Sequence, residues 1–206
     1  MKVLLVNGSP HKEGCTYIAL SEVAKTLDSC GIETEIFHIG NAPVAGCIGC
    51  GQCKQKGTCF RDDVVNAFAA KTATADAFVF GSPVHFASAT GSITAFMDRV
   101  FMLPSAQMAY KPAASVVSCR RGGATASFDQ LNKYFTIRCM PVISSNYWNM
   151  VHGSCAADVA KDEEGLQTMR VLGRNMAWIL KCIEAGRQNG INRPEPEQKI
   201  YTNYIR

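Results

Sequence analysis

The sequence has no long apolar run and no segment that resembles a secretory leader. None of its apolar stretches approaches the ~18 residues that a membrane-spanning helix needs. Met1 leads directly into a short apolar strand pattern, without the charged and apolar regions of a signal peptide. These absences predict a protein without a membrane segment that resides in the cytoplasm.

Concentrated positive charge is also missing. The net charge is +4, and Lys and Arg are scattered without a basic helix or an aromatic-interleaved strip, so nucleic acid is a poor candidate partner. A weak positive field instead suits an anionic ligand or an acidic protein. With no internal repeat or low-complexity stretch, the 206 residues predict a single domain.

Two familiar nucleotide-binding motifs are absent as well. The chain contains no G-x-G-x-x-G and no Gly-Lys-Ser/Thr at a helix start, which disfavours a dinucleotide fold and a P-loop NTPase. What is present is a buried-strand pattern over Lys2–Val6, a loop over Asn7–Thr16, and then a helix pattern. Backbone N–H groups, the helix dipole and the hydroxyls of Ser9 and Thr16 favour a mononucleotide phosphate here over a plain turn without a ligand. The phosphate-binding residues that we expect are Ser9, Lys12, Gly14, Cys15 and Thr16.

Strand and helix patterns alternate along the whole chain. They predict an α/β fold with three layers, in which a five-stranded parallel sheet is doubly wound by helices. A polar second strand over Ile32–Ile39 suits an edge, which together with the apolar first strand gives the strand order 2-1-3-4-5. The other strands are expected at Ala77–Phe80, Ala113–Ser118 and Met140–Ile143, and the helices at Thr16–Ser29, Asp62–Thr72, Ser92–Met102, Ala124–Ile137 and Asp162–Ala185.

One domain over residues 1–206 is expected to carry two additions. A cysteine-rich insertion loop covers residues 40–61, and the C-terminal helix with an extended tail covers residues 162–206, with Gly186 ending the helix. Ligands of doubly wound sheets bind beyond the carboxyl ends of the strands. The loops there are residues 7–16, 82–90 and 119–123.

The motifs in these loops are Gly8-Ser9-Pro10, Gly81-Ser82-Pro83-Val84-His85-Phe86 and Gly122-Gly123. With them the chain resembles, over essentially its whole length, the flavodoxin-like NAD(P)H-dependent FMN reductases. The resemblance implies that the first loop holds the FMN phosphate and that the other two flank the isoalloxazine ring. The implied cofactor-binding residues are Ser9, His11, Lys12, Gly14, Cys15, Thr16, Pro83, Val84, His85, Phe86, Cys119, Arg120, Arg121, Gly122 and Gly123. No side chain is expected to act as a covalent catalyst, since the flavin does the chemistry.

The chain departs from this family at two places. His85 stands where an aromatic residue such as Tyr is common, and Arg120 and Arg121 stand where smaller or neutral residues are usual. A guanidinium beside reduced flavin stabilises its negative charge, and it also suits the 2′-phosphate of NADPH. The alternative is that both arginines are solvated surface residues.

A second motif is formed by four cysteines, Cys47, Cys50, Cys53 and Cys59, with the spacing C-x2-C-x2-C-x5-C. Three thiolates at such short intervals lie on one face of a compact turn and suit three irons of a cubane. Zinc favours paired C-x2-C knuckles with a longer spacer, and a disulfide suits a cytoplasmic chain poorly. Four thiols without a metal remain an alternative.

The cysteine pattern is similar to that of the iron–sulfur flavoproteins, a branch of the same family. This resemblance implies a [4Fe–4S] cluster at the four cysteines and a homodimer or homotetramer in which cluster and flavin approach each other across subunits. Surplus apolar residues in Tyr147–Met150 and at Trp178 also predict an interface.

The expected function is that of an FMN-dependent oxidoreductase. Electrons would come from NAD(P)H or reduced ferredoxin and would pass to a small acceptor such as a quinone, a nitro or azo compound, or an oxygen species. A cluster-free NAD(P)H-dependent reductase is the main alternative. A flavodoxin-like carrier fits less well because such carriers are typically strongly acidic, and a flavin-free ligand sensor is a further alternative.

Overall fold

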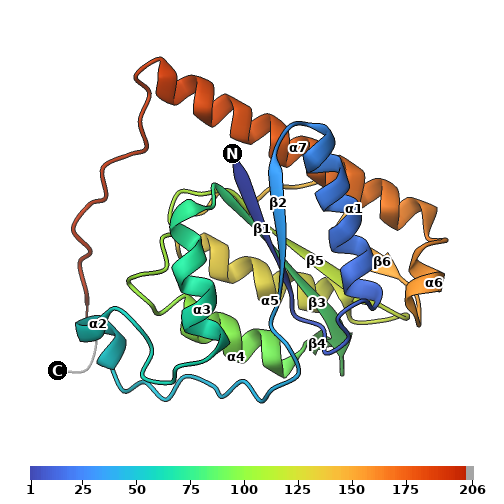
Figure 1. The fold of residues 1–206 in the computed structure, drawn as a ribbon, viewed down its shortest axis with the longest axis horizontal. Helices are drawn as coiled ribbons and strands as arrows, with labels where there is room; N and C mark the ends of the chain where they lie inside the picture. The colour runs from blue at the N-terminus through green and yellow to red at the C-terminus, as the bar shows by residue number, and fades with distance from the viewer. Residues whose placement is uncertain (203–206) are drawn as a thin grey trace.

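The computed structural model describes residues 1–202 and has a parallel sheet at its centre (Figure 1). The strands of the sheet lie in the order β2-β1-β3-β5-β6, all parallel to their neighbours, and a short β4 pairs antiparallel with β3. The predicted five-stranded α/β fold is therefore confirmed. The strands are β1 (Lys2–Asn7), β2 (Glu33–His38), β3 (Ala77–His85), β4 (Ser88–Ala89), β5 (Ala113–Cys119) and β6 (Met150–His152).

Helices cover both faces of the sheet. Figure 1 shows α3 (Val64–Lys71), α4 (Gly91–Val100) and α5 (Ala124–Thr136) on one face, and α1 (Cys15–Ser29) and α7 (Glu163–Gln188) on the other. Two short helices, α2 (Gln52–Lys56) and α6 (Ala156–Val159), lie in connections, and Thr72–Thr74 form a 3-10 turn. The arrangement gives the three layers that the alternating pattern predicts.

Two cores result from the alternation of side chains along the central strands. In β1, Leu4 and Val6 face one core, while Val3 and Leu5 face the other. The first core is largely aromatic, and Phe68 is in contact with four other phenylalanine rings at centroid distances of 5.3–6.2 Å. The second core is aliphatic and joins α1 and α7 to the sheet. The buried strands hold their carboxyl ends, and the loops beyond them, in fixed positions.

The fifth parallel strand lies in a different place from the one that the sequence suggests. Residues 140–143 form only an isolated bridge between Ala113 and Val142, whereas β6 pairs with residues 117–119 of β5. Pro141 can give no N–H to a ladder, so this segment cannot extend its pairing along β5. The prediction of a strand at Met140–Ile143 was wrong, and Met150–His152 supplies the edge strand instead.

Several element boundaries also differ from those expected. Asp63, not Asp62, caps α3 by accepting a hydrogen bond from the Val65 N–H at 3.1 Å. Strand β3 continues to His85 and turns back into β4. Helix α7 runs past Gly186 to Gln188, because the Arg187 and Gln188 side chains bond to Glu184 and extend the helical turn.

The C-terminal segment that follows α7 forms no helix or strand over residues 191–202, and its residues are exposed. The tail predicted to be extended therefore has no regular structure as far as residue 202, and residues 203–206 lie outside the described part. Among residues 1–202, no helix has both the length and the apolar character needed to cross a bilayer.

Candidate functional site

A hollow of about 270 Å³ opens at the carboxyl ends of β1, β3, β5 and β6. It is bounded by the β1–α1 loop on one side and by the loops after β3 and β5 on the other. Its lining residues are Ser9, Pro10, His11, Cys15, Thr16, Pro83, Val84, His85, Ser118, Cys119, Arg120, Gly153 and Ser154. The loops that the sequence singles out as ligand-binding therefore meet at one place.

The end of this hollow at which the sequence predicts a phosphate is the start of α1. Gly14, the N-cap, supplies no side-chain acceptor, and the first turn of α1 has no acidic residue. The N–H groups of this turn consequently remain available and the positive end of the helix dipole is uncompensated, as an anion requires. The Ser9 hydroxyl oxygen accepts from the His11 N–H at 3.1 Å, which leaves its own hydrogen free to donate.

Three expected phosphate ligands are differently placed. The Thr16 side chain is fully buried, and its hydroxyl shares a 2.9 Å hydrogen bond with the hydroxyl of Ser118. The Cys15 thiol points to the Gly153 carbonyl, 3.7 Å away, and burial raises its pKa, so it stays neutral. Lys12 is exposed and does not line the hollow. The backbone of the first turn and Ser9 are thus the strongest donors for a phosphate.

The part of the hollow at which the sequence predicts the flavin ring is built on a strained hairpin. Val84 pairs with Ala89, and the two-residue turn between β3 and β4 is made by Phe86 and Ala87, with φ of 52° and 58°. Such φ values normally require Gly or Asn, so the surrounding structure must hold these residues in place. The Phe86 side chain is fully exposed and is not part of the lining.

Gly123 makes close contact with this hairpin. A β-carbon on Gly123 would lie 2.5 Å from the Ala87 Cα, and its φ is +91°. By contrast, a β-carbon on Gly122 would meet no described atom within 4 Å. The sequence interpretation expects both glycines beside the flavin ring, which remains a prediction. The structure shows that Gly123 makes room for the opposite loop, whereas Gly122 faces open space.

The adjacent residues Arg120 and Arg121 line two different hollows. Arg120 lines the hollow that contains Ser9, whereas Arg121 lines a neighbouring one of about 410 Å³ with Gly122 and Gly123. Tyr147, Trp148, Met150 and His152 form another wall of this second hollow. Cys119 lines the first hollow and is largely buried, and burial raises the pKa of its thiol. The structure thus separates two arginines that are adjacent in sequence.

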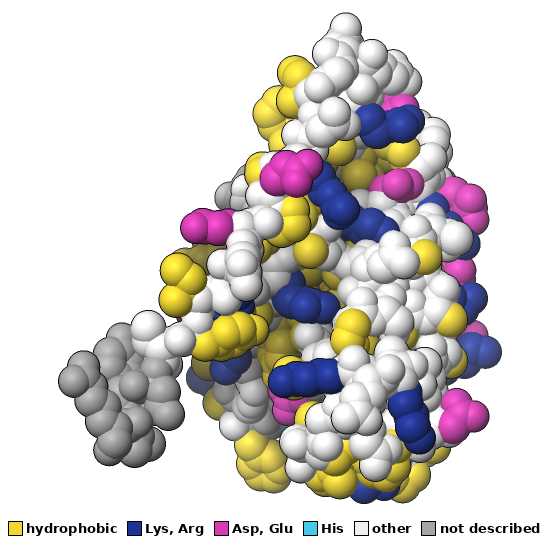
Figure 2. Space-filling model, turned by 90° about the vertical axis from the view of Figure 1, so that its left-hand side faces the viewer, with side chains coloured by type: hydrophobic (Ala, Val, Ile, Leu, Met, Phe, Trp, Pro, Cys, Tyr) yellow, Lys and Arg dark blue, Asp and Glu magenta, His cyan; other side chains and the backbone are white. Residues whose placement is uncertain are grey.

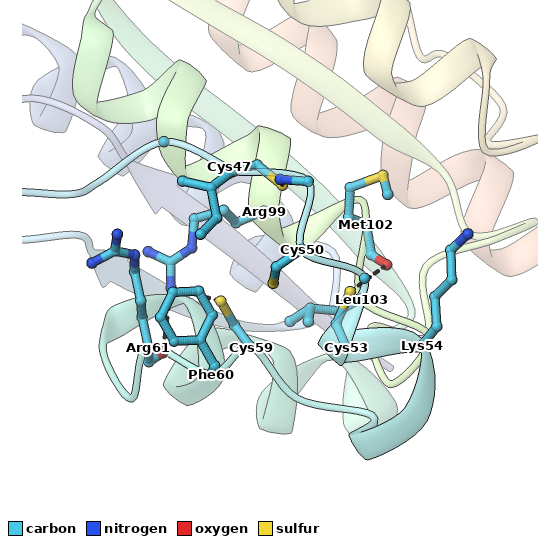
Figure 3. A pocket seen from close by; sticks show the side chains of 14 residues that line it. Cys47, Cys50, Cys53, Lys54, Cys59, Phe60, Arg61, Arg99, Met102 and Leu103 are labelled. Atoms are coloured by element: carbon cyan, nitrogen blue, oxygen red, sulfur yellow. Dashed lines mark hydrogen bonds between the residues drawn. The ribbon is translucent and has the colours of Figure 1, made fainter.

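The four cysteines of the insertion loop line a different cavity, of about 130 Å³. Figure 3 shows the sulfur atoms of Cys50 and Cys59 turned toward one another, while Lys54 points away. The Cys53 thiol donates to the Met102 carbonyl oxygen at 3.8 Å. Cys47 lines the same cavity, and its sulfur accepts from the Gly49 N–H at 3.5 Å. Positive φ angles at Gly49 and Gly51 (67° and 72°) curl the loop, so that cysteines spaced along it face one space.

A buried arginine from α4 completes this cavity. Arg99 is 2% exposed and makes paired hydrogen bonds of 2.6 and 2.9 Å to Asp63. It also donates to the Cys59 sulfur at 3.1 Å, while its Nε finds no acceptor among residues 1–202. Burial acts to lower the pKa of Arg99, but its bonds to Asp63 and Cys59 raise that pKa above the ordinary value. Arg99 therefore holds a buried guanidinium, paired with Asp63, at the wall of the cavity.

The four thiols, all in the described part of the chain, line one cavity without forming a site for a single metal ion. Within residues 1–202, no three His, Cys, Asp or Glu side chains converge as closely as one metal ion requires. The four thiols nevertheless share one cavity, and the buried Arg99, whose Nε has no acceptor among residues 1–202, is one of its lining residues. Sequence reasoning missed Arg99, Asp63 and Ser118, because an arginine and an aspartate 36 residues apart carry no local signal of contact.

Comparisons with known proteins agree with this geometry. The model of the family described as NADPH-dependent FMN reductase matches residues 1–154. An iron–sulfur flavoprotein of Methanocaldococcus jannaschii is 33% identical over 192 residues, which cover 89% of this chain and 100% of that protein. An iron–sulfur flavoprotein of Methanosarcina thermophila is 29% identical, covering 91% of this chain and 99% of the relative.

Among solved structures, RosB with bound 8-demethyl-8-formylriboflavin-5′-phosphate superposes with a TM-score of 0.71. The match covers 100% of this chain and 92% of RosB at 13% identity, so it bears on the fold alone. The fold, the hollow at the carboxyl edge of the sheet and the family match lead to one conclusion: the chain belongs to the NADPH-dependent FMN reductase family and is an FMN-dependent oxidoreductase.

Proposed function

We propose that this oxidoreductase carries a [4Fe–4S] cluster at Cys47, Cys50, Cys53 and Cys59 in addition to FMN. The observation that carries the proposal is that four thiols of a single loop line one cavity of about 130 Å³ with a buried guanidinium at its wall. Cluster assembly requires thiolates, and a fixed positive charge favours them. The similar proteins named iron–sulfur flavoproteins support the same assignment.

The FMN side of the function rests on groups at the carboxyl edge of the sheet. The first turn of α1 and the Ser9 hydroxyl would bind the phosphate, and the hairpin after β3 would orient the ring. When bound, FMN exchanges electrons singly or in pairs, so it can connect two-electron and one-electron partners. Arg120 lies in the same hollow, where its charge would stabilise reduced, anionic flavin.

Electrons would come from NAD(P)H or from reduced ferredoxin, and a small molecule would accept them. Figure 2 shows Lys and Arg side chains across the middle of one face, with few Asp or Glu among them. Lys54 and Lys56 of α2 and Arg61 are exposed beside the cysteines. A positive surface near the cluster site would attract an acidic electron-transfer protein. The acceptor would be a quinone, a nitro or azo compound, or an oxygen species.

A homodimer or homotetramer forms part of the proposal. In Figure 1 the insertion loop leaves β2 and runs to α2, on the side of the molecule away from the β1–α1 loop. A second copy would bring a cysteine loop closer to the flavin hollow. Tyr147, Trp148 and Trp178 are 54%, 50% and 64% exposed, and large exposed aromatics of this kind favour an interface. The cytoplasm, which keeps cysteines reduced, suits this protein.

Protein purified without oxygen tests the cofactor set. We expect FMN together with iron and acid-labile sulfide in equal amounts. Cys50→Ser should lose iron and sulfide but keep FMN, since Cys50 does not line the flavin hollow. Cys182→Ser is a matched control, because Cys182 is an exposed thiol of α7 outside both cavities. Stoichiometric zinc, or no metal after anaerobic reconstitution with iron and sulfide, would contradict the cluster.

A cluster-free NAD(P)H-dependent FMN, quinone, nitro or azo reductase is the second candidate. It is favoured by the spread of the four sulfurs, which do not converge on one ion within the described residues. Metal-free protein that reduces menadione with NADPH as fast as the iron-loaded protein would support this candidate. Sedimentation at micromolar concentration tests the assembly, and a strictly monomeric mass would contradict it.

A further inference from the structure

We propose that Arg99 is the positioning residue of the cysteine-lined cavity, and that its Nε donates a hydrogen bond to a sulfur of the bound group. The inference rests on the proposed function, because it takes that group to be a cluster with anionic sulfur atoms. Arg99 belongs to α4, whereas the cysteines belong to a loop some forty residues earlier. It holds the cysteine segment and the bound group in place and touches no substrate.

The first argument is the way in which Arg99 ties the loop together. Its guanidinium donates to the carbonyl oxygens of Ala45 (3.4 Å) and Arg61 (3.3 Å) and to the Cys59 sulfur (3.1 Å). Ala45 precedes the first cysteine of the motif, and Arg61 follows the last one. One side chain, anchored on a packed helix, therefore fixes both ends of the cysteine segment and one of its sulfurs.

The second argument is the cost of burying this charge. A guanidinium that is 2% exposed needs a partner, and Asp63 supplies one through two hydrogen bonds. Asp63 is itself held by its role as the N-cap of α3. Its ion pair with Arg99 thus joins α3 and α4 behind the cysteines, and the loop rests on two helices of the aromatic core.

The third argument is the unpaired Nε of Arg99. Buried N–H groups in proteins are almost always hydrogen-bonded, but this one has no acceptor among residues 1–202. The other two guanidinium nitrogens of Arg99 each have acceptors, such as Asp63 and Cys59. Arg99 also lines the cavity that the four cysteines share. A cluster sulfide or a cysteine thiolate would supply the missing acceptor.

Such a contact has a measurable consequence besides binding. Positive charge and hydrogen bonds at cluster sulfurs stabilise the reduced state, which carries one more negative charge, and so raise the reduction potential. Arg61 offers a matched control: it lines the same cavity, but it is exposed and its guanidinium stacks on the Phe60 ring at 5.0 Å. Arg61→Met removes a positive charge from this cavity without removing a hydrogen bond to a cysteine.

The experiment compares Arg99→Met, Arg99→Lys and Arg61→Met with the unaltered protein after anaerobic reconstitution. FMN content is measured alongside, since it reports that each variant is folded. We expect Arg99→Met to hold iron and sulfide about 10- to 100-fold less tightly against a chelator, the usual effect of losing an outer hydrogen-bond partner. The cluster that remains should have a lower midpoint potential. Arg99→Lys should restore part of the potential, and Arg61→Met should change neither quantity as much.

Unchanged chelator resistance and potential in Arg99→Met would overturn the inference, and so would equal effects in Arg61→Met. If the unaltered protein takes up no iron and sulfide, the proposed cluster fails, and hydrogen exchange on the metal-free protein decides the role of Arg99. Arg99→Met must then speed exchange of the amides in residues 45–61, and Arg61→Met must not. Equal exchange in both variants would refute the positioning role itself.

Discussion

Replacing Gly123 with alanine should disturb the two loops that meet at the carboxyl edge of the sheet. Gly123 has φ of +91°, and a β-carbon there would lie 2.5 Å from the Ala87 Cα and 3.0 Å from the Val84 Cγ1. The Ala87 backbone cannot easily yield, because Val84 and Ala89 pair in a hairpin whose two-residue turn is already strained. Gly123→Ala must therefore move the hairpin, α5 or both.

The free energy of unfolding should fall measurably. Overpacking of this kind costs about 1–3 kcal/mol, and the left-handed backbone costs alanine about 1–2 kcal/mol. The reduced entropy of the unfolded chain offsets about 0.4–1 kcal/mol. A net loss of roughly 1–4 kcal/mol follows, which for a domain of this length lowers Tm by about 2–4 °C for each kcal/mol.

The matched control is Gly122→Ala, since a β-carbon at Gly122 meets no described atom within 4 Å. Thermal unfolding of both variants without FMN measures the stability difference, and fluorescence titration then measures FMN binding. Gly123→Ala should lower both Tm and FMN affinity. Gly122→Ala should leave Tm nearly unchanged and should weaken FMN only if the ring packs on Gly122. Equal Tm values for the two variants would refute the steric reasoning.

Three further predictions address the FMN phosphate, the arginines and pH. Ser9→Ala should weaken FMN binding about 10- to 100-fold in a fluorescence titration, since a hydrogen bond to a charged group contributes about 1.5–3 kcal/mol; unchanged affinity would exclude Ser9 as a ligand. Arg120→Gln should lower the flavin reduction potential in a redox titration more than Arg121→Gln does, because Arg120 lines the same hollow as Ser9. A raised KM for NADPH but not for NADH in either variant would instead indicate 2′-phosphate binding. Hydrogen bonds from Lys71 and Lys2 lower the pKa of Glu35, so its stabilising effect is present above 4.5 and is lost as the pH falls through the lowered value. Glu35→Gln should consequently destabilise by about 0.5–1 kcal/mol in denaturant unfolding at pH 7, and the difference should vanish at low pH.

The order of the strands could be predicted from the sequence, because it depends on the composition of each strand, which is a local property. A strand buried on both faces must be apolar throughout, and a strand at an edge tolerates charge, so Lys2–Val6 and Ile32–Ile39 already indicate a central and an outer position. The loops of the flavin hollow follow from this order, because every parallel strand ends at the same edge. The four cysteines of the insertion loop can likewise be recognised as a motif from their spacing alone.

The fifth strand could not be identified in the same way. Met150–His152 is only three residues long, and its neighbours Tyr147 and Trp148 obscure any alternation. The competing segment 140–143 has a more continuous apolar pattern, yet it makes a single bridge to Ala113. Which segment completes the sheet depends on where the chain, after α5, returns beside β5, and that is a property of the whole fold.

The sequence by itself thus determined the fold class, the strand order and the loops that carry chemistry, because periodicity, turn residues and cysteine spacing are encoded locally. The tertiary structure decided which side chains of those loops face one another. It places Arg120 and Arg121 in different hollows and packs Gly123 against the hairpin after β3. It also brings Arg99 into contact with Asp63 and Cys59. Contacts of this kind depend on the packing of distant segments, and a buried charge becomes recognisable only when its partner is in place.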